Sequence, residues 1–194
     1  FGEAVKFLAS LAGMKPYIFS KQDEQREKDW NNYKEIYRTY IDYFHNELLK
    51  NKNSSDAKLY IKNRGLKLDD VKNFKLGFVT SEIEFYDYLS KKFDTKDLNN
   101  SGIFYYDEKR QKYINRFRDR IIFPINNISG DAIAIGGRAI KENNFLAKYI
   151  NSPETQFFKK GSNLYNLDKS RKMSNKIDFV FLVEGYMDVI GLFK

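Results

Sequence analysis

The sequence contains no cysteine and a single histidine, His45, and this scarcity excludes several kinds of site. A disulfide scaffold and a Cys/His zinc site are excluded, as is any Cys–His or Ser–His nucleophile pair that does not use His45. No apolar run approaches the ~20 residues that a membrane helix needs, and no signal-peptide pattern opens the chain, so we expect a cytoplasmic location and no membrane contact. Hydrophobic residues make up 42% and aromatic residues 16%, enough for a sizeable core.

Positive charge is the second feature, and it is concentrated in one stretch of the chain. The formal net charge of the chain is +8, and residues 109–172, with 14 basic and 5 acidic side chains, carry a net charge of +9 that accounts for the whole excess. Such a stretch on a folded domain indicates a surface for a polyanion, although a solvated lysine-rich face would give the same composition.

The first half of the chain predicts helices. Residues 1–13 have apolar side chains on one helical face, and Gly13 stands where a helix ends. The polar stretch 14–29 is expected to be a linker whose end could extend the next helix. From Trp30 to Leu48, aromatic and aliphatic residues recur at 3/4 spacing, which predicts a long amphipathic helix whose aromatic stripe belongs to the core. His45 beside it has no second metal ligand one turn away and is interpreted as structural. Ser54 or Ser55 is expected to cap a short helix that stops at Gly65.

The second half of the chain predicts strands. A short strand is expected within 74–79 and a helix within 83–93. A hairpin is expected from strands at 103–106 and 112–114, and a second pair from strands at 121–125 and 132–138. Residues 178–183 form a continuous apolar run typical of a strand buried on both faces, and a helix should follow Gly185. We expect an α/β (α+β) fold, in which a helical N-terminal part precedes a mixed β-sheet.

The end of this last predicted strand carries two carboxylates. Glu184 and Asp188 flank Gly185, and ligands of open α/β sheets gather at the carboxyl ends of strands. The two side chains could hold a divalent cation or transfer a proton, or they could complement the dipole of the following helix.

Six segments together resemble the bacterial-type DNA primases. Glu184-Gly185-Tyr186-Met187-Asp188 resembles the first motif of that family's TOPRIM fold. The upstream matches, in order, are residues 60–66, 116–125, 136–139, 147–155 and 158–165, and residues 3–13 resemble the end of the family's zinc-binding domain. Two small departures are Ala147, where the family often has Pro, and Lys159, an added charge beside Lys160. The run 148–154 is the most specific segment.

The resemblance implies a domain plan and a set of binding residues. Residues 1–13 would be the tail of a preceding zinc-binding domain, 14–29 a linker, 30–175 the basic subdomain of the catalytic core, and 176–194 the start of a TOPRIM domain, so we expect a piece of a longer protein. By motif match, template and incoming nucleotide would be bound by Arg64, Arg116, Arg118, Arg120, Arg138, Lys148, Tyr149 and Lys160. For Tyr149 buried packing is favoured over stacking on a base. Gly136 and Gly137 would let a ligand approach the backbone, or would mark a β-bulge.

The resemblance also implies the chemistry and the partners. The longer protein would synthesise RNA primers on single-stranded DNA with the help of Mg²⁺ or Mn²⁺. Glu184 and Asp188 would supply the first carboxylates for this cation, and the other acids would lie beyond Lys194. This piece alone would therefore be inactive. Zn²⁺ would bind only outside this segment. Expected partners are single-stranded DNA, ribonucleoside triphosphates, the replicative helicase and a single-strand-binding protein, with a monomeric enzyme. Two alternatives stay open: another TOPRIM enzyme, and a non-catalytic module that binds single-stranded DNA or docks a helicase.

Overall fold

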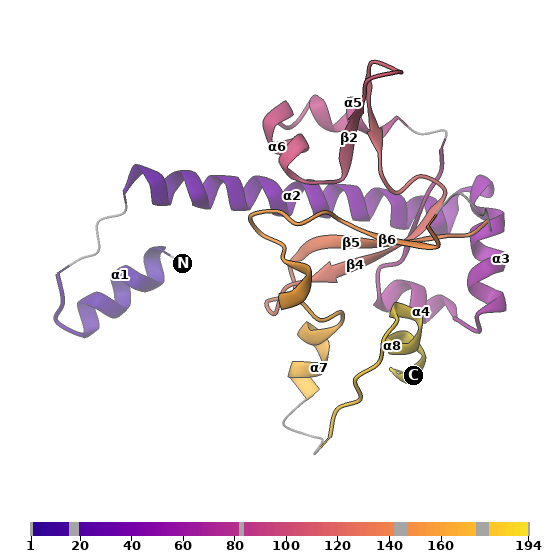
Figure 1. Ribbon diagram of the computed structural model, residues 1–194. Coiled ribbons are helices and arrows are strands. Elements are labelled where there is room, and N and C mark those ends of the chain that lie inside the picture. Colours follow the sequence, from indigo (N-terminus) through magenta and orange to yellow (C-terminus); the bar gives the residue numbers. More distant parts are fainter. Residues whose placement is uncertain (1, 16–19, 82–83, 142–146, 174–178, 194) are drawn as a thin grey trace.

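The computed structural model describes residues 2–15, 20–81, 84–141, 147–173 and 179–193 (Figure 1). The helices are α1 (Gly2–Leu11), α2 (Lys21–Lys50), α3 (Ser55–Asn63), α4 (Leu68–Asn73), α5 (Phe85–Ser90), α6 (Thr95–Asn100), α7 (Leu167–Met173) and α8 (Tyr186–Leu192), with 3-10 turns η1 (Lys52–Ser54) and η2 (Lys160–Ser162). The strands are β1 (Gly77–Val79), β2 (Phe104–Asp107), β3 (Lys112–Asn115), β4 (Arg120–Asn126), β5 (Ala132–Ala139) and β6 (Tyr149–Asn151).

Helix α2 is the long helix that the aromatic periodicity predicts, and its stripe lies in the core. Tyr33, Tyr37 and Tyr40 are at most 4% exposed. Each hydroxyl donates a hydrogen bond, respectively to the Ile133 carbonyl at 2.6 Å, the Ser101 carbonyl at 2.8 Å and Asn115 Oδ1 at 2.9 Å. Burial of these rings is therefore achieved without leaving the hydroxyls unsatisfied. Figure 1 shows α2 crossing the sheet, with α5, α6 and the β2–β3 hairpin on its other side.

The start of α2 is fixed by polar contacts. Ser20 and Asp23 form a reciprocal capping box, in which Ser20 Oγ accepts from the Asp23 N–H at 3.2 Å and Asp23 Oδ2 accepts from the Ser20 N–H at 3.0 Å. The helix thus begins inside the stretch 14–29, and the domain boundaries there stay a prediction.

His45 is 8% exposed and its Nδ1 lies 2.6 Å from the Leu76 carbonyl, which confirms its structural role.

A four-stranded sheet forms the centre of the molecule, in the order β1-β4-β5-β6. Every pairing within it is antiparallel, with Arg120 opposite Val79 and Ala139, and Arg138 opposite Ile121 and Tyr149. The α/β (α+β) class is confirmed. The mixed pairing that we expected is not found, because all strand pairs among the described residues are antiparallel.

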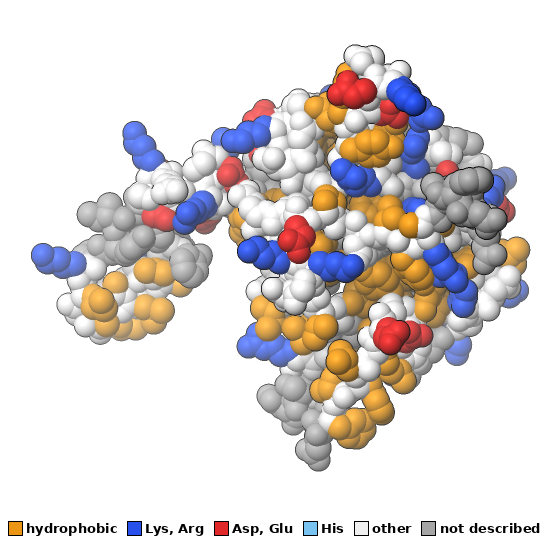
Figure 2. Space-filling model, in the orientation of Figure 1, with side chains coloured by type: hydrophobic (Ala, Val, Ile, Leu, Met, Phe, Trp, Pro, Cys, Tyr) orange, Lys and Arg blue, Asp and Glu red, His pale blue; other side chains and the backbone are white. Residues whose placement is uncertain are grey.

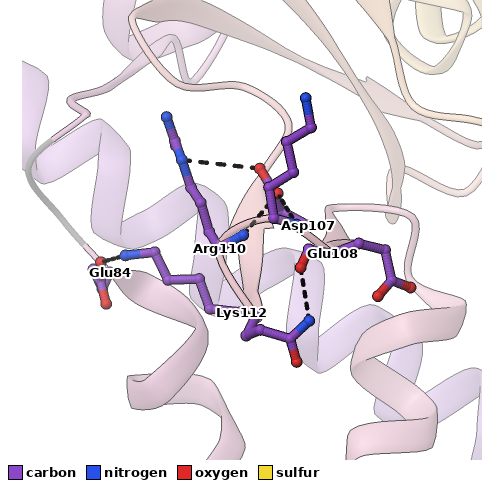
Figure 3. Close-up of polar contacts among 7 residues, drawn as sticks. Glu84, Asp107, Glu108, Arg110 and Lys112 are labelled. Carbon is purple, nitrogen blue, oxygen red and sulfur yellow. Dashed lines mark hydrogen bonds and ion pairs between the residues drawn. The ribbon is translucent and has the colours of Figure 1, made fainter.

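The β2–β3 hairpin is the strand pair predicted for 103–106 and 112–114 (Figure 3). Asp107 organises its turn, since Asp107 Oδ1 accepts from the backbone N–H groups of Lys109 at 3.0 Å and Arg110 at 3.1 Å. Glu84 accepts from the Lys112 ammonium and so ties the hairpin to the residue that precedes α5. These contacts are exposed and contribute little stability individually.

Two of the predicted local structures are wrong. Residues 179–183 form no strand, and Phe179, Val180, Phe181 and Leu182 are 64–81% exposed. A buried strand needs neighbours that accept and donate its backbone hydrogen bonds, and no described residue pairs with this segment. Ser54 precedes α3 but makes no capping bond; its hydroxyl donates instead to the Glu47 carbonyl at 3.0 Å. The helix expected after Gly185 is present as α8.

The buried tyrosines predict instability at alkaline pH. Burial raises the pKa of Tyr33, Tyr37 and Tyr40, and raises that of Tyr186 to about 12. An unfolded tyrosine ionises near pH 10, so this contribution to stability is complete below about pH 10 and is lost as pH rises through the folded-state values. We expect the melting temperature to fall steeply above about pH 10. Circular-dichroism melts across that range test this, and a flat profile up to about pH 12 would contradict it.

Candidate nucleic-acid interface

Arg120, Arg138 and Lys148 lie at one end of the β4-β5-β6 strands, whereas Lys160 follows the other end of β6. Arg138 lies opposite Tyr149 across the β5–β6 pair, and Arg120 lies opposite Ala139 at the start of β4. Neighbouring residues of a strand point to opposite faces, and Arg138 is paired with Ile121 rather than with Arg120. The two arginines therefore share one end of the sheet but lie on opposite faces.

Arg138 is held between two aromatic rings. Its guanidinium carbon lies 5.0 Å from the centre of the Tyr60 ring, which comes from α3, and 4.8 Å from that of Tyr149 on β6. Arg138 is only 5% exposed, and its Nε is buried without a hydrogen-bond partner. Within the described segments no carboxylate forms an ion pair with it. A buried, unpaired guanidinium is costly, which makes this side chain a strong candidate for binding an anion.

Arg120 is buried on the opposite face, at 6% exposure. Its Nη1 donates to the Lys148 carbonyl at 3.3 Å and more weakly to the Gly137 carbonyl at 3.5 Å. Burial lowers the pKa of Arg120, and the nearby Asp119 carboxylate opposes that shift. Arg120 therefore binds the backbone of the β5–β6 end and stabilises the position of Lys148.

Arg116 and Arg118 lie in the turn between β3 and β4. Phe117 between them is fully buried, and the Asp119 N–H donates to the Val79 carbonyl at 2.7 Å, so the turn is anchored from within. Arg116 is exposed and lies 5.2 Å from the Tyr105 ring centre, whereas Arg118 is half-buried. Both arginines are thus presented from a fixed turn.

Gly136 and Gly137 serve packing, not a β-bulge. A Cβ on Gly136 would lie 2.5 Å from the Tyr186 ring, and one on Gly137 would lie 2.7 Å from the Phe117 ring. The register irregularity of the sheet lies elsewhere, between Ile125 and Asn126. Two rings therefore lie directly on the backbone of β5, one on each face.

Residues 151–154, within the matched segment 147–155, also serve the fold. Tyr186 Oη donates to Asn151 Oδ1 at 2.6 Å, the Ile135 N–H donates to Ser152 Oγ at 3.0 Å, and the Lys160 N–H donates to Glu154 Oε1 at 3.1 Å. These polar groups hydrogen-bond to backbone and side chains within the fold. They hold β6 and the loop of Lys160 against β5.

The remaining basic side chains are open to solvent. Arg64, Lys148 and Lys160 are exposed, as is Tyr149 at 38%. Buried packing, the favoured prediction for Tyr149, is wrong because β6 is the edge strand and leaves one side of the ring uncovered. Arg64 Nε donates to Tyr60 Oη at 3.0 Å.

The two carboxylates lie at the start of α8. Glu184 and Asp188 are exposed, and Asp188 stands in the first turn, where it also suits the helix dipole. Over the described part of the chain, no three acidic, histidine or cysteine side chains form a metal-binding group. Figure 2 shows acidic side chains over α8, surrounded by hydrophobic surface and by Lys and Arg side chains. Two accessible carboxylates suit a hard divalent cation but supply too few ligands alone.

Two tyrosines of this region were absent from the predicted site. Tyr60 lies against Arg138, and Tyr186 stacks on Phe123 with ring centres 5.1 Å apart. The signal for Tyr60 was its spacing to Arg64, because residues four apart share a helix face. The signal for Tyr186 is the pair Gly136–Gly137, because a residue without a Cβ leaves room for a ring on its backbone. The sequence does not say which ring takes that place.

The fold and site define an α+β protein with a desolvated arginine, exposed lysines and aromatic rings at one end of an antiparallel sheet, the features of a polyanion-binding domain. Residues 43–171 match the family model of the DNA primase catalytic core, N-terminal domain. The chain belongs to this family of DNA primases.

Individual relatives agree with this assignment. The chain is 35% identical over 195 residues to a DNA primase of Staphylococcus epidermidis, covering 98% of this chain and 32% of that protein. It is 37% identical over 202 residues to a DNA primase of Buchnera aphidicola, covering 99% and 33%. The chain thus spans about a third of the length of these curated relatives.

Solved structures show the same fold. A structure of the Aquifex aeolicus primase, with its zinc-binding and RNA polymerase domains, matches with a TM-score of 0.73 and 30% identity, covering 98% of this chain and 45% of that one. A DnaG primase catalytic domain bound to single-stranded DNA matches with a TM-score of 0.76 and 27% identity, covering 86% and 51%. None of the helices in the described segments could cross a bilayer.

Proposed function

We propose that this chain is the template-binding part of a primase that synthesises short RNA primers on single-stranded DNA. The observation that carries the proposal is the buried guanidinium of Arg138, which lacks a carboxylate partner in the described segments and lies against the rings of Tyr60 and Tyr149. A permanent charge that the fold has desolvated and not neutralised interacts strongly with a phosphate. Membership of the primase family supports nucleic acid as the source of that phosphate.

The role that we propose for each basic residue follows from the solvent exposure of its side chain. Exposed Arg64, Arg116, Lys148 and Lys160, together with half-buried Arg118, would contact the phosphates of template or nucleotide, and exposed Tyr149 could also stack on a base. Arg120 would act by holding the Lys148 backbone, since its Nη1 donates to the Lys148 carbonyl. The replicative helicase, a single-strand-binding protein and ribonucleoside triphosphates are the partners we propose for the longer protein.

We propose Glu184 and Asp188 as the first ligands of Mg²⁺ or Mn²⁺. Both are exposed carboxylates, the ligand type that such cations prefer. A bound divalent cation would neutralise phosphate charge during nucleotidyl transfer. The rest of the coordination sphere would come from acids that follow in the full-length protein, within the proposed TOPRIM domain. Primer synthesis from ribonucleoside triphosphates by the full-length protein, with Mn²⁺ and single-stranded template, tests the proposal; its complete absence would reject it.

The second candidate function is a non-catalytic module that binds single-stranded DNA. The observation in its favour is that the acids near α8 do not form a metal-binding group within the described segments. A full-length protein that binds template and synthesises no primer would support this candidate. Membership of the primase family weighs against another kind of TOPRIM enzyme.

Binding of single-stranded DNA by this chain should depend strongly on salt. If roughly 4–6 phosphates are engaged, with a slope of about −0.7 per phosphate for single strands, affinity should fall about 50- to 300-fold between ~50 and ~200 mM salt. The motivation is the net charge of +9 over residues 109–172. Fluorescence anisotropy of a labelled oligothymidine across this range measures the slope. Binding that ignores salt would refute the basic surface as the interface.

A further inference from the structure

The contacts of Arg138 are aromatic rings instead of carboxylates. The rings of Tyr60 and Tyr149 lie 5.0 Å and 4.8 Å from its guanidinium carbon, and they come from α3 and β6. Rings attract a cation without neutralising it, because a quadrupole carries no net charge. A carboxylate in their place would form an ion pair and weaken the interaction with any further anion.

The stack continues beyond Tyr60. The guanidinium of Arg64 lies 5.3 Å from the Tyr60 ring centre, and Arg64 Nε donates to the Tyr60 hydroxyl at 3.0 Å. Tyr60 thus contacts both the buried Arg138 and the exposed Arg64, and it is itself only partly exposed. Arg64 and Arg138, which are 74 positions apart in the sequence, are brought together by this one ring.

Tyr149 is fixed in turn by α8. Its ring centre lies 6.3 Å from that of Tyr186, which packs on the Gly136 backbone and donates to Asn151 Oδ1. The ring is therefore supported although its strand is at the edge of the sheet. Two rings from different elements therefore lie against the Arg138 guanidinium.

We propose that Tyr60 and Tyr149 are positioning residues that clamp the guanidinium of Arg138 and keep it desolvated and correctly oriented for a phosphate group. This inference rests on the proposed function and deepens it, because it assigns a role to Tyr60, which does not itself need to touch the phosphate. The phosphate belongs either to the template backbone or to the incoming nucleotide. A template phosphate affects the salt dependence of DNA binding, whereas a nucleotide phosphate affects the KM for ATP.

The test replaces the Tyr60 ring in the full-length protein. Tyr60→Leu should raise the Kd for a labelled oligothymidine about 5- to 30-fold, the range that a desolvated cation–π contact represents. It should also reduce the salt slope by about 0.7, the value of one lost phosphate contact on a single strand. If the phosphate belongs to the nucleotide, the slope stays unchanged and the KM for ATP in primer synthesis rises by the same factor instead.

Matched variants separate positioning from folding. Tyr60→Phe keeps the ring and removes only the hydroxyl that accepts from the exposed Arg64 Nε, so its Kd and KM should stay within about 2-fold of wild type. Tyr88→Leu removes an exposed ring on α5 that carries its own cation, Lys92, at 4.6 Å, and should change neither the slope nor the KM. If Tyr60→Leu fails to fold, Tyr149→Leu on the exposed edge strand should give the same change, as the second side of the clamp.

A double-mutant cycle completes the test. Tyr60→Leu should add no further loss in an Arg138→Ala background, because the ring would then have no guanidinium to hold. Full additivity, or a wild-type slope and KM in Tyr60→Leu, would overturn the clamp while leaving the proposed function intact. A wild-type protein that neither binds oligothymidine nor synthesises primers would instead reject the proposed function.

Discussion

Glu184→Gln in the full-length protein is expected to abolish primer synthesis and leave template binding unchanged. The amide keeps the shape of the side chain but removes the charge that a divalent cation or a proton transfer requires, so nucleotide addition should fall by roughly 10²-fold or more. Template binding should persist because the basic residues around Arg138 are untouched. The measurement compares Mn²⁺-supported nucleotide addition and oligothymidine binding for the variant and the wild type.

The alternative role of Glu184 predicts a different result. If the carboxylate only complements the dipole of α8, its loss should lower stability by about 0.3–1 kcal/mol and leave synthesis close to normal. Glu35→Gln serves as the control, since Glu35 is an exposed carboxylate on α2 that pairs with Arg38 at 2.8 Å. Substantial residual synthesis by Glu184→Gln would assign Glu184 to the helix end and favour the non-catalytic candidate.

The sequence predicts those parts of the fold that depend on neighbours within a few turns. The aromatic stripe of α2 and both strand pairs were expected from periodicity alone, and the structure confirms them. Helix α4, with six residues, is too short to show a period and was not predicted. The strand at 178–183 failed because an apolar run predicts burial, whereas a strand also requires a partner whose backbone accepts its hydrogen bonds.

The same limit applies to the site. Residue type was enough to nominate Arg120 and Arg138, but only the register places them on opposite faces, one bound to backbone carbonyls and the other between two rings. Tyr60 lies in the segment 60–66 that resembles the primase family and still is not among the predicted site residues, because its contact with Arg138 joins α3 to β5. Such contacts between distant segments carry no local sequence signal.

Lys148→Ala and Lys160→Ala should each reduce primer synthesis far more than they reduce stability. Both side chains are exposed, and the fold uses only their backbones: the Lys148 carbonyl accepts from the Ala139 N–H at 3.0 Å, and the Lys160 N–H donates to Glu154. Alanine preserves these bonds. Loss of a charge-assisted phosphate contact costs roughly 1.5–3 kcal/mol, or about 10- to 150-fold in synthesis.

The free energy of unfolding of these variants distinguishes a phosphate contact from a structural role. An exposed lysine whose side chain carries no structural bond should change the free energy of unfolding by no more than about 0.5 kcal/mol when truncated. Lys96→Ala on α6 is the matched control, an exposed lysine outside the basic stretch 109–172, and should change neither quantity. Dinucleotide formation and thermal melting are measured on the same preparations. A fall in melting temperature that accounts for the lost synthesis would make Lys148 and Lys160 structural, and the phosphate contacts would then have to come from the arginines alone.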